Sequence, residues 1–220
     1  FLKESPSICV ESSAGSNILV SSREGEIHRI TPRRNDSVND SWMTDSGREL
    51  YKQVSSDSRL LSASVSGNSS SLTEAISAAS EMFKDKKLGV VGSCKSSVEE
   101  QYLLNKLSKN LKAKKFLRGH FGKDDGILLS ADRTPNLRGN LVTGFSNKYP
   151  SDQLSDLSIS IQKKQVNALL VIGEDLSESG VDLEDLKSIP VVFLGTHQNA
   201  TADFSEVVIP TLTSFEKSGS

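Results

Sequence analysis

The larger part of the sequence alternates short apolar runs with segments of helical pattern, and this alternation constrains the fold more than any other feature. The apolar runs lie at 88–92, 126–130, 168–173, 190–195 and 206–210. Uninterrupted runs of this length are typical of strands buried on both faces, and alternation with helices favours a parallel sheet. We therefore expect an α/β domain with a Rossmann-like parallel sheet from residue 72 onwards.

Helical patterns fall between these runs. We expect a helix from Ser71 to about Lys84, because Ser71 and Glu74 form a capping pattern. A second helix should begin after Ser97, and its apolar residues recur at helical spacing: Tyr102, Leu103, Leu107 and Leu111. Two further helices are expected, at 152–165 and 183–187.

The first part of the chain has the pattern of short strands. Residues 17–31 contain two β-leaning segments separated by Glu24-Gly25, which predicts a β-hairpin that Pro32 ends. A Ser-rich stretch with few large apolar side chains follows. These patterns predict three regions: a small β-rich subdomain at 1–54, a linker at 55–71 and the α/β domain at 72–220.

Composition excludes several functional classes. Lys and Arg number 26 against 28 Asp and Glu, a balance that argues against nucleic-acid binding. No apolar run approaches the roughly 20 residues needed to cross a bilayer, so we expect no direct membrane insertion. The chain starts at Phe1 without a signal-peptide pattern and stops at Ser220 without a terminating element, so we expect a truncated piece of a longer chain. The two cysteines, Cys9 and Cys94, indicate a reducing, intracellular setting, although a bond between them stays open.

The most specific pattern lies near the N-terminus. It combines Cys9, the dipeptide Asn17-Ile18 and the segment WMTDSGR from Trp42 to Arg48. This pattern resembles the iron–sulphur segment of the molybdopterin oxidoreductase superfamily, and within it the version in the large iron–sulphur subunit of respiratory NADH:quinone oxidoreductase. In that family a C-x2-C-x3-C run precedes Asn-Ile, a fourth Cys lies between the Trp and the Asp-x-Gly-Arg, and four thiolates hold a 4Fe–4S cluster.

The resemblance places the four ligand positions at Cys9, Ser12, Ser16 and Thr44. Only the first is a cysteine, and a hydroxyl is far less acidic than a thiol and a poorer ligand for a soft cluster. The resemblance thus implies a degenerate 4Fe–4S site without its cluster. We expect no metal, no molybdopterin and no catalytic residue in this region.

Three later stretches resemble the same family. They are Asp132-Arg133-x-Pro135-Asn136, then Ser93 and Ser97 with Glu99-Glu100, and finally Glu216-Lys217-x-Gly219-Ser220. Physical interpretations exist beside the resemblance: Asp132 and Arg133 could pair or fix a tight turn, and Ser97 could cap a helix. The complete phosphate-loop motifs are absent after Gly92, although a helix N-terminus there could bind an anion weakly. Three glycines follow strands, where ligands usually meet such a sheet: Gly92, Gly173 and Gly195.

Other chemistry-bearing residues form no recognised motif. The three histidines, His28, His120 and His197, have no metal-site spacing, and His28 is expected at an outward position of its strand. Cys94 lies just before a predicted helix, where a reactive thiolate is an alternative to a buried thiol.

The resemblance implies a non-catalytic scaffold within a subunit of the respiratory complex, involved in electron transport and packed against the other subunits. Its expected location is the cytoplasmic, peripheral arm of the membrane-bound complex. Two alternatives remain: a fragment of a molybdopterin-dependent oxidoreductase such as a formate dehydrogenase, and a generic α/β ligand-binding domain.

Overall fold

The computed structural model describes all residues from 1 to 220, and they form two compact units. Unit 1 contains residues 1–57 and 120–135, and unit 2 contains residues 58–119 and 136–220. The polypeptide therefore leaves unit 1, begins unit 2, returns to unit 1 for one long loop, and completes unit 2 afterwards.

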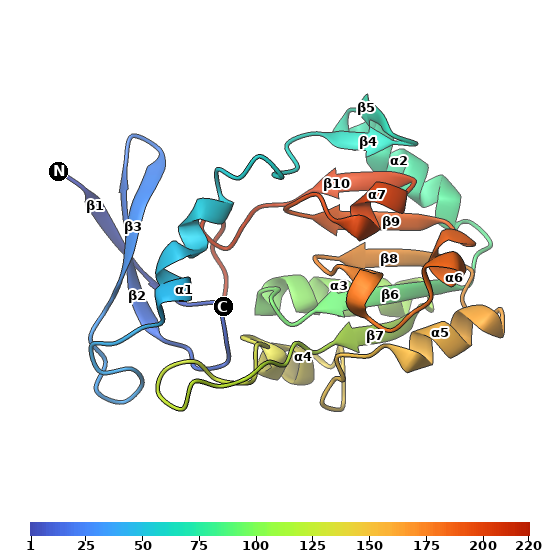
Figure 1. The fold of residues 1–220 in the computed structure, drawn as a ribbon. Helices are drawn as coiled ribbons and strands as arrows, with labels where there is room; N and C mark the ends of the chain where they lie inside the picture. The colour runs from blue at the N-terminus through green and yellow to red at the C-terminus, as the bar shows by residue number, and fades with distance from the viewer. The chain divides into compact units, whose positions relative to one another are not determined.

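Unit 1 is built on a three-stranded antiparallel sheet with strand order β1-β2-β3 (Figure 1). The strands are β1 (Lys3–Ile8), β2 (Asn17–Arg23) and β3 (Glu26–Pro32), followed by α1 (Asp45–Glu49) and the 3-10 helix η1 (Leu50–Gln53). The predicted hairpin is confirmed as β2 and β3. Glu24 and Gly25 have φ values of 54° and 86°, the paired positive angles that favour a tight hairpin turn.

Unit 2 contains a seven-stranded sheet with the order β5-β4-β10-β9-β8-β6-β7 (Figure 1). Its strands are β4 (Ala63–Val65), β5 (Asn68–Ser70), β6 (Leu88–Ser93), β7 (Lys114–Arg118), β8 (Ala168–Ile172), β9 (Val191–Gly195) and β10 (Val207–Pro210). The five strands from β10 to β7 are parallel, and β4 and β5 add an antiparallel hairpin at the other edge. The expected α/β class with a mostly parallel sheet is confirmed.

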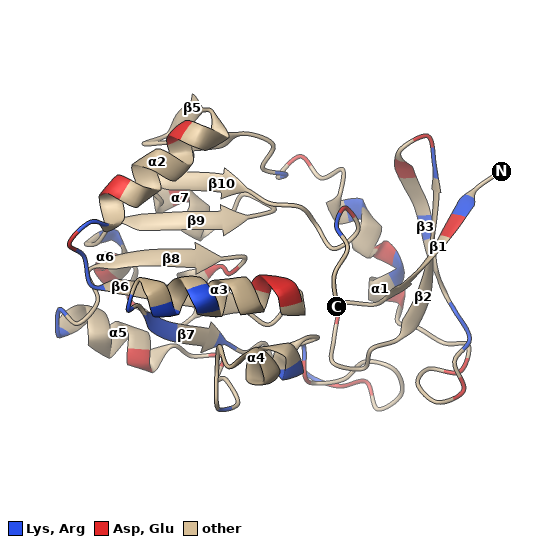
Figure 2. Cartoon of the chain, turned by 180° about the vertical axis from the view of Figure 1, so that it is seen from behind, with Lys and Arg blue, Asp and Glu red and all other residues tan.

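Helices cover both faces of this sheet. They are α2 (Leu72–Phe83), α3 (Val98–Asn110), α4 (Leu137–Thr143), α5 (Ser155–Gln162), α6 (Leu183–Lys187) and α7 (Ala200–Phe204), with the 3-10 helix η2 (Leu176–Glu178). Side chains of α2, α3 and α4 enter one apolar core, and those of α5, α6 and α7 enter the other (Figure 2). The sheet is thus the middle layer of three, as expected for strands that are apolar on both faces.

The strand order places a topological switch point at β6. The polypeptide passes from β6 outward to β7 and then crosses back to β8 on the other side of β6. In open sheets of this type, ligands usually bind beyond the carboxyl ends of the strands at the switch point.

Two predicted details of the strands are wrong. Residues 126–130 form no strand but a loop of unit 1, in which the Asp125 carboxylate accepts N–H groups from Ile127, Leu128 and Leu129 at 2.8–2.9 Å. Ile127 is 86% exposed, so this apolar run does not enter a core. The sheet instead uses β7, whose sequence KKFLR lacks a continuous apolar run.

Other elements differ in extent from the prediction. Within the stretch expected to be a linker, residues 63–70 contain the β4–β5 hairpin. The helix expected over 152–165 is confined to α5, and α4 and α7 were not predicted. The predicted caps of α2 and α3 are confirmed, since Ser71 and Ser97 each form a complete capping box.

The orientation of α3 is unusual. Its buried residues are Gln101, Leu104, Asn105 and Ser108, three of which are polar. The apolar residues that recur at helical spacing are exposed instead: Tyr102, Leu103, Leu107 and Leu111. This helix therefore turns much of its apolar surface away from the sheet.

We predict that Leu169→Ala will lower the free energy of unfolding by about 2–5 kcal/mol. Leu169 is fully buried in the middle of β8, and its loss would leave a cavity that the packed sheet cannot close. Urea denaturation would measure the change. Leu61→Ala is the matched control: Leu61 is 83% exposed in the same unit, so we expect a change within about 0.5 kcal/mol. Equal effects of the two substitutions would contradict the assignment of the core.

Candidate functional site

The four predicted ligand positions all lie in unit 1, around the loop between β1 and β2. Cys9 directly follows β1, and Ser12 and Ser16 belong to the loop itself. The Cys9 N–H donates to the Ser16 carbonyl oxygen at 2.8 Å, which closes the loop. Thr44 is the N-cap residue of α1, and its hydroxyl accepts the Gly47 N–H at 3.0 Å.

Two of the four positions converge on Gly47. A Cβ placed on this glycine would lie 3.1 Å from Cys9 Sγ and 2.7 Å from Thr44 Oγ1. A side chain larger than hydrogen therefore has no room between the thiol and the hydroxyl. Ser12 Oγ instead accepts the N–H of Ala14 at 3.3 Å, and no hydrogen bond joins the side chain of Ser12 or Ser16 to Cys9 or Thr44.

Glu11 is a member of this site that the sequence analysis missed. The Thr44 hydroxyl donates a hydrogen bond to the Glu11 carboxylate. Burial raises the pKa of the Cys9 thiol and the negative charge of Glu11 raises it further, while a hydrogen bond with the Glu11 backbone opposes the change. The thiol thus stays protonated at neutral pH, beside a carboxylate. The motif could not reveal Glu11, because it directs attention only to the ligand positions.

This set of groups does not fit a 4Fe–4S cluster. Such a cluster needs four thiolates, and the loop offers one buried thiol together with hydroxyls, of which that of Thr44 is already hydrogen-bonded. No three His, Cys, Asp or Glu side chains of the structure converge as a metal site.

The polypeptide frame around these positions is held by amides. Asn39 Oδ1 accepts the Asn17 N–H at 3.0 Å, and Asn39 Nδ2 donates to the Trp42 carbonyl at 2.9 Å. Arg33 donates to Asn17 Oδ1 and receives support from the same strand, because its N–H donates to the Asn17 carbonyl at 2.8 Å. These contacts tie the segment before α1 to the start of β2, so the loop keeps its shape without a cluster.

The Asp-Arg-x-Pro-Asn stretch contributes to both units. Asp132 Oδ1 accepts the Thr134 N–H at 2.8 Å, which confirms that this carboxylate fixes the turn. The Asp132 carbonyl also accepts the Ser13 N–H at 3.0 Å in the degenerate loop. Arg133 does not pair with Asp132 but donates to the Lys123 carbonyl at 3.0 Å. Asn136 belongs to unit 2, where its side chain donates to the Ser96 carbonyl at 2.9 Å.

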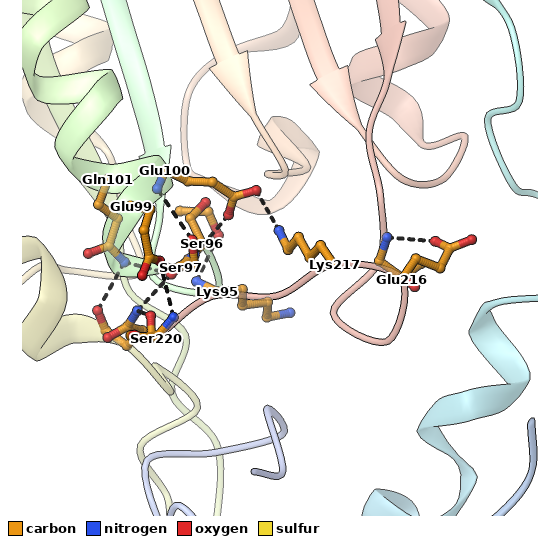
Figure 3. Close-up of polar contacts among 12 residues, drawn as sticks. Lys95, Ser96, Ser97, Glu99, Glu100, Gln101, Glu216, Lys217 and Ser220 are labelled. Atoms are coloured by element: carbon orange, nitrogen blue, oxygen red, sulfur yellow. Dashed lines mark hydrogen bonds and ion pairs between the residues drawn. The ribbon is translucent and has the colours of Figure 1, made fainter. Parts of the chain in front are cut away.

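The carboxyl edge of the large sheet is covered by the C-terminal segment, residues 211–220 (Figure 3). Val98 N–H, in the first turn of α3, donates to the Ser220 carbonyl oxygen at 2.7 Å. Ser220 N–H donates to Glu99 at 3.1 Å, and Lys217 donates to Glu100 at 2.6 Å. The two family-like stretches at 93–100 and 216–220 therefore bind each other at the N-terminus of α3.

A second ion pair anchors this segment. Arg59 and Glu216 lie 2.8 Å apart, and the Arg59 side chain is only 6% exposed. Arg59 also donates to the Thr196 carbonyl at 2.8 Å, just beyond β9. The protein's own backbone thus occupies the helix N-terminus where a weakly bound anion was an alternative. Gly92 serves packing instead, because a Cβ there would lie 2.7 Å from the Phe145 ring.

The remaining candidates do not form a site. Cys9 and Cys94 are free thiols in different units, and Cys94 is fully buried, with its Sγ 3.5 Å from the Arg118 carbonyl oxygen. His28 is exposed on β3, as expected. His197 Nδ1 lies 2.8 Å from the Thr196 hydroxyl, in unit 2, while His120 belongs to unit 1.

The fold and the loop at Cys9 together define a class: oxidoreductase subunits that combine a small iron–sulphur-type domain with an α/β domain. Residues 2–52 match the family described as NADH-ubiquinone oxidoreductase NDSU1/NuoG-like, 4Fe-4S domain. The sequence belongs to the NuoG family of NADH-quinone oxidoreductase subunits.

Relatives that are named as the NuoG-type subunit of NADH-quinone oxidoreductase extend the similarity beyond this domain. The protein of Pseudomonas fluorescens is 30% identical over 80% of this chain, and that of Rickettsia prowazekii is 25% identical over 95%. The matched part is 18% of the first relative and 33% of the second, so the 220 residues span at most a third of their length. None of the helices is both long enough and apolar enough to span a membrane.

We predict that acid will release the C-terminal segment from α3. Hydrogen bonding, above all from the Ser220 backbone N–H, lowers the pKa of Glu99 to about 2 from 4.5. Because the pKa is lowered in the folded state, the contribution of Glu99 is complete above about pH 4.5 and is lost as the pH falls towards 2. NMR titration of the Ser220 amide would measure the midpoint.

Glu99→Gln is the control for this titration, since an amide in place of the carboxylate removes the ionisable group. The Ser220 amide should then shift little over the same pH range. A wild-type midpoint near 4.5 would contradict the contact.

Proposed function

We propose that this chain is a non-catalytic scaffold region of the large iron–sulphur subunit of a respiratory NADH:quinone oxidoreductase, in which the iron–sulphur site has been lost. The family assignment supports the parent complex. A single observation carries the finer proposal: among Cys9, Ser12, Ser16 and Thr44 only Cys9 offers a thiol, and it lies beside the carboxylate of Glu11.

The physical chemistry of the site supports a structural role. A protonated, buried thiol is a poor ligand for iron, and a carboxylate beside it disfavours its ionisation. The amide contacts of Asn17 and Asn39 hold the loop by themselves. We therefore assign no catalytic, cofactor-binding or metal-binding residue to this region, and no molybdopterin.

The proposed partners are the other subunits of the NADH:quinone oxidoreductase complex, and the proposed location is the cytoplasmic, peripheral arm. The names of the relatives support the first part of this proposal. The near balance of charge argues against nucleic acid as a partner.

Iron content tests the lost site directly. We predict that the protein, produced and reconstituted under anaerobic, iron-replete conditions, will contain no stoichiometric iron and no visible cluster absorption. The triple variant Ser12→Cys, Ser16→Cys, Thr44→Cys should gain both, because it restores four thiols in the family's spacing.

The matched control is the same triple variant with Cys9→Ala, which offers only three thiols and should bind less iron. Stoichiometric iron in the unmodified protein would contradict the proposal. Molybdenum and tungsten analysis of the same samples separates the remaining enzyme hypothesis, since a bound pterin metal would favour it.

A further inference from the structure

Helix α3 is held to its unit by polar groups, which leaves its leucines on the outside. Gln101 Nε2 donates to the Ser96 carbonyl at 2.8 Å, and Asn105 Nδ2 donates to the Thr143 carbonyl at 2.7 Å. Leu104 is the only large apolar side chain of the helix among its buried residues. An amphipathic helix normally buries its apolar stripe, so the reversed arrangement of α3 needs an explanation.

The exposed leucines form one row. Leu103, Leu107 and Leu111 are four residues apart, which places them on one side of the helix, and they are 61%, 42% and 43% exposed. We call these three residues the leucine row. Asn105 faces α4 through its contact with Thr143, so the row lies on the opposite flank of α3. Figure 2 shows α2 on the same face of the sheet, and α2 exposes Leu72 and Ile76 at 55% and 54%.

Charges at the ends of α3 define what could cover this row. The first turn carries Glu99 and Glu100, and the far end carries Lys109 and Lys112 (Figure 2). Neither Lys109 nor Lys112 has an ion-pair partner in the structure. A second helix laid antiparallel on the row would bring its acidic first turn to the lysines and its basic last turn to Glu99, which also suits both helix dipoles.

We propose that the leucine row is the docking site for an amphipathic helix of a partner protein. This helix runs antiparallel to α3, has an apolar stripe, an acidic first turn and a basic last turn. Helices commonly bind partners through apolar anchors spaced three or four residues apart. The surface involves α3 alone, so it does not depend on whether the iron–sulphur site is lost.

A second copy of the protein fits this surface less well. A symmetric antiparallel pair of α3 helices would centre on Leu107, because that residue is the middle of the row. Lys106 adjoins this centre and is exposed, so the pair would bring two Lys106 ammonium groups close together. A different helix with a neutral or acidic centre avoids this repulsion.

A designed peptide provides the test. The probe is a fluorescently labelled 18-residue helix with leucines at every third or fourth position, two Glu in its first turn and two Lys in its last. Fluorescence anisotropy with the 220-residue protein should show saturable binding. Leu103→Ser with Leu107→Ser should weaken binding at least about tenfold, because anchor residues carry most of the energy of such interfaces.

Two controls make the result specific. Val142→Ser removes another exposed apolar side chain, 83% exposed on α4, and should bind the probe as the unmodified protein does. Lys109→Glu with Lys112→Glu should weaken binding of the probe and favour a peptide whose end charges are reversed. Circular dichroism and urea denaturation confirm that each variant is folded, as expected for exposed positions.

Several outcomes would overturn the proposal. They are the absence of binding by either peptide, equal binding by the leucine variants, and indifference of the charge variants to the direction of the peptide charges. Sedimentation that shows a dimer of the protein, dissociated by Leu107→Ser, would assign the row to a second copy instead.

Discussion

Burial of β6, β8 and β9 on both faces is the constraint on which the rest of unit 2 depends. Strands with apolar side chains on both sides cannot face water, so helices must cover each face. Parallel strands need long crossovers, which the helices supply, and all carboxyl ends then meet at one edge. That edge is where the C-terminal segment meets α3, so a burial requirement in the middle of the sheet determines where the family-like stretches lie.

The sequence predicted the elements whose physics is local and strong. The apolar runs of β6, β8, β9 and β10 and the capping boxes of α2 and α3 were recognisable because burial and capping leave clear patterns. Strand β7 was missed because an edge strand can carry charged side chains on its open side, and KKFLR does so. The run at 126–130 misled for the opposite reason: Asp125 binds three backbone N–H groups there and makes a turn of an apolar segment.

Within the candidate site, the motif located positions but not contacts. It identified Cys9 and Thr44, which the structure brings to either side of Gly47. It could not reveal Glu11, whose role depends on how the loop folds back towards α1. For α3, helical spacing correctly indicated one apolar side, but spacing alone cannot tell which side faces the sheet. Long-range hydrogen bonds of Gln101 and Asn105 decide that, and such bonds leave no periodic signal.

The contact between Ser220 and Val98 has a mechanical consequence. A pull applied at Ser220 would act first on the N-terminus of α3 and on the ion pair of Lys217 with Glu100. The pair of Arg59 with Glu216 would bear the load next, and the hydrogen bonds between β10 and β9 only after that. The segment would thus behave as a series of clamps that yield one after another, shielding the parallel sheet from strain until the last of them opens.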